Sequence, residues 1–108
     1  MTEKIKLVAG DNRPYIKLTL RDADGNAINL ENTTVRVYFR AVGSDTVLST
    51  ITCNMINGGR DGQVSFNFTG NTLDVEPGPY EGEVEIDFGG ELQTVYDVLK
   101  FQVRQQFN

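Results

Sequence analysis

The sequence predicts an all-β protein, a sandwich of two antiparallel sheets with about seven strands. Apolar and polar residues alternate in short runs along most of the chain, and no stretch shows a convincing helical period. Clusters of turn-forming residues separate the runs at the spacing typical of a sandwich. The chain has 108 residues, the length of one ordinary domain, and its 11 glycines suit a fold with many turns. We therefore expect a single domain over residues 1–108.

Seven runs carry the alternation. We expect strands at residues 3–9, 15–21, 35–40, 46–56, 64–68, 80–88 and 91–104. The third run is the cleanest amphipathic strand, because Val35, Val37 and Phe39 alternate with polar neighbours. In the sixth run the residues expected to face inward are Gly82, Val84, Ile86 and Phe88. Asp97 falls on the inward side of the last run, which predicts a bulge there.

Three connections separate these runs. Residues 57–62, Asn-Gly-Gly-Arg-Asp-Gly, supply positive-φ positions, so we expect a hairpin between the runs on either side. Residues 22–26, Asp-Ala-Asp-Gly-Asn, have the composition of a calcium loop, but Gly25 is fourth in the loop and Thr33 twelfth. An EF-hand needs Gly sixth and Glu twelfth, so a hairpin turn is favoured. Residues 69–79 contain two prolines and two glycines and indicate a crossover between sheets.

Tyr80 follows this crossover directly, in the sequence Pro-Gly-Pro-Tyr. Such an entry into a strand resembles the tyrosine corner of immunoglobulin-like domains, in which the Tyr hydroxyl bonds back to the preceding connection. The alternative is a partly buried aromatic residue after an ordinary loop. The sequence contains one cysteine and no tryptophan, so it lacks the inter-sheet disulfide and core Trp of antibody domains. The pattern therefore supports the wider immunoglobulin-like class.

Charge and composition argue against several functions. Ten Lys and Arg against 15 Asp and Glu give a net charge of −5, which repels nucleic acids and anionic membranes. The absence of His removes the usual general base and the commonest transition-metal ligand. The sequence contains no nucleotide-binding motif, no amino-terminal apolar signal segment and no membrane-length apolar run. We therefore expect a protein that is not an enzyme and has no cofactor, metal, nucleic-acid or membrane partner.

Cys53 is the only cysteine, so the chain cannot form an internal disulfide. In residues 51–55 the odd positions are all apolar, which places the thiol on the inward face of a strand. No Lys, Arg or His adjoins Cys53 to stabilise a thiolate. A buried structural thiol is therefore favoured over a reactive one.

Four carboxylates follow one another on the outward face of the sixth run. This acidic row consists of Glu81, Glu83, Glu85 and Asp87. In an immunoglobulin-like sandwich the sixth strand lies between the third and the seventh. Those strands carry Arg36 and Arg40 on one side and Lys100 and Arg104 on the other. The residues favour a solvated face in which opposite charges compensate each other, and the alternative is a cation or partner site.

Several stretches together resemble a known family. They are residues 10–20 (GDNRPYIKLTL), 22–30 (DADGNAINL), 34–40 (TVRVYFR), 62–66 (GQVSF), 77–84 (PGPYEGEV) and 100–103 (KFQV). They resemble the amino-terminal domain of bacteriophage baseplate upper proteins and related small phage tail structural proteins, over nearly the whole chain. The chain departs from that pattern at residues 31–33, Glu-Asn-Thr, where such domains often carry Gly, and at residues 89–90, Gly-Gly, in place of the usual Asp-Gly.

The resemblance implies a structural role in the virion. Such a domain docks onto a tail or baseplate core and assembles with other phage tail or baseplate proteins, or with itself as a homo-oligomer. It implies a location in the phage tail after synthesis in the host bacterial cytoplasm. The helical and receptor-holding parts of a full baseplate upper protein have no counterpart here. The resemblance therefore leaves two interpretations: an excised domain or a short stand-alone relative. We expect the edge strands and residues 69–79 to make the contacts.

The rival hypothesis, from another class, is a bacterial surface or accessory immunoglobulin-like module that binds a glycan or a host protein. Exposed aromatic residues in a groove would favour it. Tyr38 is the one aromatic residue that the alternation assigns to the outward face.

Overall fold

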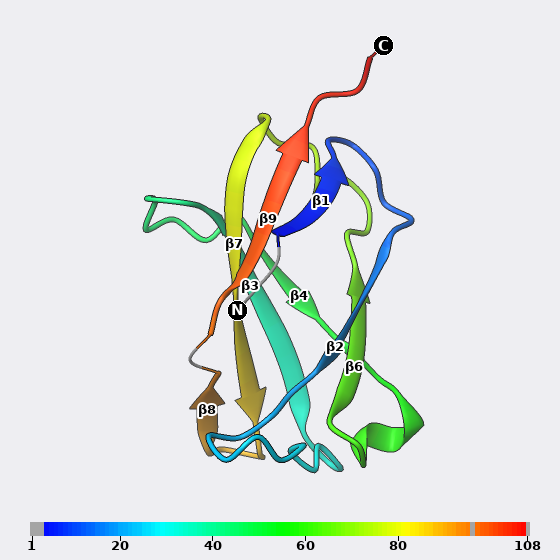
Figure 1. Cartoon of the computed structure of the whole chain (residues 1–108), viewed down its shortest axis with the longest axis vertical. Coiled ribbons are helices and arrows are strands. Elements are labelled where there is room, and N and C mark those ends of the chain that lie inside the picture. Colours follow the sequence, from blue (N-terminus) through cyan, green and yellow to red (C-terminus); the bar gives the residue numbers. More distant parts are fainter. Residues whose placement is uncertain (1–3, 96, 108) are drawn as a thin grey trace.

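Two β-sheets account for most of the chain in the computed structural model, which describes residues 4–95 and 97–107. Within these ranges, sheet A contains β1 (Lys4–Val8), β3 (Thr34–Ala41), β4 (Ser49–Thr52), β7 (Gly78–Asp87), β8 (Leu92–Thr94) and β9 (Leu99–Arg104). Sheet B contains β2 (Tyr15–Thr19), β5 (Asn54–Met55) and β6 (Gln63–Asn67), and the 3-10 turn η1 (Asn57–Gly59) joins its last two strands. The sheets pack face to face (Figure 1), which confirms the predicted β-sandwich.

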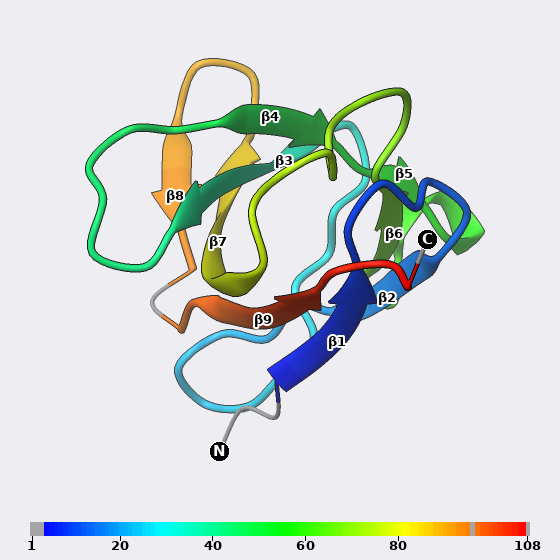
Figure 2. The ribbon, with the colours of Figure 1, turned by 90° about the horizontal axis from the view of Figure 1, so that it is seen from above.

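The strand order in sheet A is β1-β9-β7-β3-β4, with β8 paired to the far end of β7, and in sheet B it is β2-β6-β5. The sixth predicted strand, β7, thus lies between the third and the last, as expected. Described strand pairs are antiparallel except for β1, which runs parallel to β9. Viewed from above, sheet A curves from β4 round to β1 and sheet B covers its open side (Figure 2).

The core follows the predicted alternation. Its fully buried side chains are Leu30, Val35, Val37, Phe39, Val64, Phe66, Phe68, Leu73, Val84, Ile86, Phe101 and Val103. The Phe39 ring lies at the centre and contacts Phe68 and Phe101 edge-on, with ring centroids 5.3 and 5.5 Å apart. Burial of one such aromatic side chain contributes roughly 1.5–3 kcal/mol to folding.

The predicted strand 46–56 is wrong as a single element. Its residues form two strands in different sheets, because β4 pairs with β3 as far as Thr52 and β5 pairs with β6 from Asn54 onward. The chain changes sheet at Cys53, whose amide donates to the Val35 carbonyl at 2.8 Å. Apolar alternation continues through this bend, so the sequence pattern does not reveal it. The hairpin predicted around residues 57–62 is confirmed, since β5 and β6 pair antiparallel.

The predicted strand 91–104 is also divided in two. β8 pairs with the end of β7, where Leu92 lies opposite Asp87, whereas β9 pairs with its beginning, where Leu99 lies opposite Gly82. Asp97 lies exposed in the connection between them, so the predicted bulge is a break in the strand. The inward prediction for Phe88 is wrong as well. Phe88 is 39% exposed because it follows the end of β7 and starts the turn to β8.

Candidate assembly surfaces

Tyr80 forms the predicted tyrosine corner. Its hydroxyl donates to the backbone carbonyl of Glu76 at 2.6 Å, and its ring stacks on Phe39 with centroids 5.1 Å apart and planes at 14°. Burial raises the pKa of Tyr80, so the hydroxyl stays protonated and able to donate. The corner therefore ties the crossover before β7 to the start of that strand.

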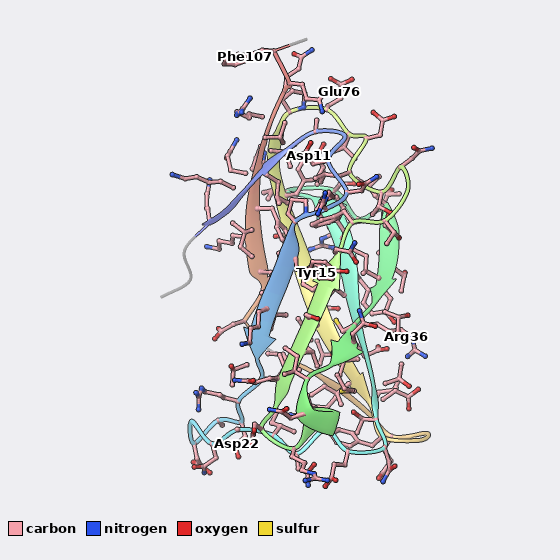
Figure 3. The ribbon with its side chains drawn as sticks, turned by 90° about the vertical axis from the view of Figure 1, so that its right-hand side faces the viewer. Asp11, Tyr15, Asp22, Arg36, Glu76 and Phe107 are labelled. Atoms are coloured by element: carbon pink, nitrogen blue, oxygen red, sulfur yellow. The ribbon has the colours of Figure 1, made fainter. Side chains whose placement is uncertain are left out.

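A wide groove opens at this end of the sandwich. It has a volume of about 910 Å³, and its walls include Leu48, Val75, Pro77 and Phe107 together with two acidic residues, Asp74 and Glu76. We call it the apical groove. One wall belongs to the predicted crossover, residues 69–79, where the amide of Gly10 donates to the Leu73 carbonyl at 2.9 Å. Figure 3 shows Glu76 and Phe107 at the same end of the molecule, far from Asp22.

The connection between β3 and β4, residues 42–48, projects sideways from the sandwich (Figures 1 and 2). We call it the arm. Its three aliphatic side chains, Val42, Val47 and Leu48, are each about half exposed. Leu48 reaches the apical groove, whereas Val47 borders the outer face of sheet A. Exposed apolar side chains gathered in this way are typical of contact surfaces. The sequence missed the arm because residues 46–48 continue the apparent strand.

The acidic row lies on the outer face of sheet A, where the arginines of β3 neutralise part of its charge. Arg40 Nε donates to Glu81 Oε2 at 2.7 Å. Arg36 Nη1 lies 3.7 Å from Glu85 Oε1 and 3.6 Å from Asp87 Oδ2. These contacts confirm the expected charge compensation on this side of β7.

Three further hydrogen bonds fix the chemistry of this face. The Tyr38 hydroxyl donates to Glu85 Oε1 at 2.8 Å, and this bond raises the pKa of Tyr38. The amides of Gly89 and Gly90 donate to Asp87 Oδ1 at 2.9 and 3.0 Å. Donors to the charged form lower the pKa of the Asp87 carboxyl, Gly90 contributing most, with help from the Arg36 guanidinium.

Compensation from β9 is not found. Val103 lies opposite Gly78, so Arg104 lies beyond the start of β7 and past the acidic row. Lys100 lies opposite Glu81, whose carboxylate is already held by Arg40. In the described part of the chain, neither Lys100 nor Arg104 approaches a carboxylate within 4 Å. The register of β9 therefore leaves Arg104 without the expected partner, and Arg40 holds the carboxylate that Lys100 faces.

The other predicted site, at residues 22–26, is a structural turn. Asp22 Oδ1 accepts hydrogen bonds from the amides of Asp24 and Asn26 at 2.9 and 3.0 Å. Arg21 and Ala27 form an isolated antiparallel β-bridge on either side of this turn, which confirms the predicted hairpin turn. Within residues 4–95 and 97–107, no three carboxylates gather in the way that a metal ion would need. No helix in those ranges is long and apolar enough to span a bilayer.

Cys53 is buried, as predicted. Burial raises the pKa of its thiol to about 12, because a thiolate would lose its hydration at this position. The neutral thiol therefore acts as a small apolar side chain at the sheet crossing.

Besides Phe88, two exposed aromatic residues were missed. Tyr15 is 70% exposed on the outward face of β2, and Phe107 is 96% exposed, with the Arg104 guanidinium carbon 5.1 Å from its ring centroid. The parity that buries Ile16 would have placed Tyr15 outward. Phe107 lies past the last strand, where no periodic signal exists. Tyr38, the predicted outward aromatic, is half-buried against the acidic row.

These features define an immunoglobulin-like β-sandwich with an apolar groove and arm at one end and a charged face on sheet A. The structure is similar to one titled "N-terminal domain of phage TP901-1 ORF48", with a TM-score of 0.58 and 15% sequence identity. The likeness covers 96% of this chain and 85% of that one and shows a common fold. No protein-family model matches the sequence, and no curated protein matches it.

Proposed function

We propose that this chain is a non-enzymatic structural domain of a phage tail or baseplate, a single domain over residues 1–108 that assembles with other virion proteins. The observation that carries the proposal is the fold shared with a phage protein domain over 96% of the chain. The stretches of the sequence that resemble baseplate upper proteins point to the same class of protein.

The apical groove and the arm are the surfaces that suit this function. Protein interfaces combine an apolar centre with a polar rim, and here Leu48, Val75 and Pro77 lie beside Asp74 and Glu76. The tyrosine corner holds one wall in place, so docking costs little ordering of the backbone. Such a domain works by presenting surface, which the symmetry of a particle repeats, and it needs no chemistry of its own.

The experiment is mass spectrometry of virions purified from a phage that encodes this chain, with the wild-type gene and two variants compared. We expect wild-type peptides in a fixed ratio to tail proteins. A double variant of the arm, Val42→Asp with Leu48→Asp, should be depleted at least tenfold, whereas Thr50→Asp, an outward control on neighbouring β4, should be retained. Absence of the wild-type chain from purified particles would contradict the phage role. Equal retention of both variants would contradict docking through the arm but would not contradict the phage role.

The rival hypothesis, a surface module that binds a glycan, draws on one observation. Phe107 is exposed beside the apical groove, and exposed aromatic rings commonly stack on sugars. A glycan array run with the wild-type chain and with Phe107→Ala separates the two functions. Binding to a defined glycan that is lost in the variant, together with absence from virions, would favour the surface module.

A further inference from the structure

The outer face of sheet A carries a second charged region beside the acidic row. We call it the basic strip, and it consists of Lys4, Lys6, Lys100 and Arg104. In the register of β1 and β9, Lys4 lies opposite Lys100 and Val8 opposite Arg104, so these side chains share one face of the sheet. The strip holds four of the ten cationic residues of a chain whose net charge is −5.

No side chain of the basic strip forms an ion pair within 4 Å in the part of the chain that the structure describes, where the ion pairs found involve Arg36, Arg40 or Arg60. Lys4 Nζ donates to the Gln102 amide oxygen at 3.3 Å, and Arg104 donates to the Gln105 carbonyl at 3.0 Å. These neutral acceptors do not offset the charges of Lys4 and Arg104, and Lys100 lies opposite Glu81, which Arg40 already holds. The strip therefore attracts anionic groups within about 10 Å at moderate salt.

The strip borders an open strand edge. Sheet A ends at β1, which pairs with β9 on one side and with no other strand in the described ranges. The amide of Ala9 donates to the Arg104 carbonyl at 2.8 Å, and hydrogen bonding alternates along a strand. The backbone groups of Lys4 and Lys6 therefore point away from β9. The Val8 carbonyl accepts from Asp11 at 3.1 Å, which closes this edge at its upper end.

The chemistry of the edge selects its occupant. A second copy that paired its own β1 here would bring the lysines of two copies together, and like charges on neighbouring strands are destabilising. Lysine on an edge strand is a common guard against such self-pairing. An extended segment with Asp or Glu at alternate positions would instead place carboxylates against Lys4 and Lys6 while its backbone bonds to the edge.

We propose that the open edge of β1 binds an extended acidic segment of a partner protein, which adds to sheet A as a further strand beside the basic strip. The proposal rests on the proposed assembly function for one point, which is that the partner is a virion protein. It names the chemistry that recognises this partner: main-chain hydrogen bonds from the β1 edge and carboxylates opposite the lysines.

The test is an NMR titration of the isolated ¹⁵N-labelled chain with a capped synthetic peptide, Glu-Thr-Glu-Val-Glu-Thr. A peptide with Lys at each Glu position is the control ligand. We expect the acidic peptide to shift the amide signals of β1 and to slow hydrogen exchange at Lys6 and Val8, and the basic peptide to do neither. A rise in salt from about 50 to 500 mM should weaken binding by at least fivefold.

Two charge variants locate the site. The double variant Lys4→Glu with Lys6→Glu should weaken binding at least tenfold, whereas Lys17→Glu, which changes an exposed lysine on the edge strand of sheet B, should change it less than twofold. Circular dichroism checks that each variant is folded. If Lys4→Glu with Lys6→Glu does not fold, the double variant Lys4→Gln with Lys6→Gln takes its place.

Absence of binding at millimolar peptide, equal binding of the basic peptide, shifts confined to the apical groove, or self-association through β1 would each overturn the proposal. None of these outcomes bears on the presence of the chain in virions, so the two proposals fail separately.

Discussion

The tyrosine corner gives the sharpest test of how this fold is held together, through Tyr80→Phe. The substitution removes the hydroxyl that donates to the Glu76 carbonyl at 2.6 Å but keeps the ring, and so keeps the stack on Phe39. A hydrogen bond contributes about 1 kcal/mol net, and the carbonyl left partly buried without its donor adds a further cost. We expect a total loss of about 1.5 kcal/mol in the free energy of unfolding.

Tyr38→Phe is the matched control, because it removes the same hydroxyl from a more open position. Its bond is to Glu85 at 2.8 Å, and that carboxylate retains Arg36 and access to water. We therefore expect Tyr38→Phe to cost less than about 0.5 kcal/mol.

The assay is urea unfolding followed by circular dichroism, with the slope of the transition compared between variants. In a chain of this size a loss of about 1.5 kcal/mol lowers the melting temperature by about 6 °C. Equal losses for the two Tyr→Phe variants, or a loss below about 0.5 kcal/mol for Tyr80→Phe, would refute the structural role of the corner.

Three further predictions concern the core, the thiol and the turn after β7. Gly82→Ala should destabilise the fold by about 1–2 kcal/mol in urea unfolding, because the added Cβ would lie 3.0 Å from the Phe101 ring; unchanged or increased stability would contradict this packing. The Cys53 thiol, with a pKa of about 12, should react with a disulfide reagent at least about 100-fold slower than a small free thiol until urea unfolds the chain, and rapid labelling of the folded protein would show that the site opens. Asp87 has a lowered pKa, so it stabilises the fold above the unfolded pKa of about 3.9 and loses this effect as pH falls through the folded pKa. Asp87→Asn should therefore make the urea midpoint less sensitive to pH between 2 and 5, and an unchanged pH profile would rule this out.

Local patterns in the sequence predict much of this fold correctly. Side chains alternate across a strand, so the parity of Val35, Val37 and Phe39 is enough to direct them to the core. Turn residues also act locally, which is why the hairpin at residues 57–62 was predicted. The tyrosine corner joins residues only four apart, and the sequence around Tyr80 indicated it. The acidic row and its arginine partners on β3 required one further assumption, the strand order of an immunoglobulin-like sandwich.

The remaining features depend on pairing between distant segments. The sheet change at Cys53 and the break around Asp97 occur where a strand exchanges one neighbour for another, and the period of two is the same on both sides of each exchange. Register placed Arg104 beyond the acidic row, and the parallel pairing of β1 with β9 assembled the basic strip. The apical groove is lined by segments that meet only in the folded chain. The sequence by itself thus determined which face each strand turns to the core, because alternation is local, whereas only the tertiary structure decided which strands became neighbours and in what register.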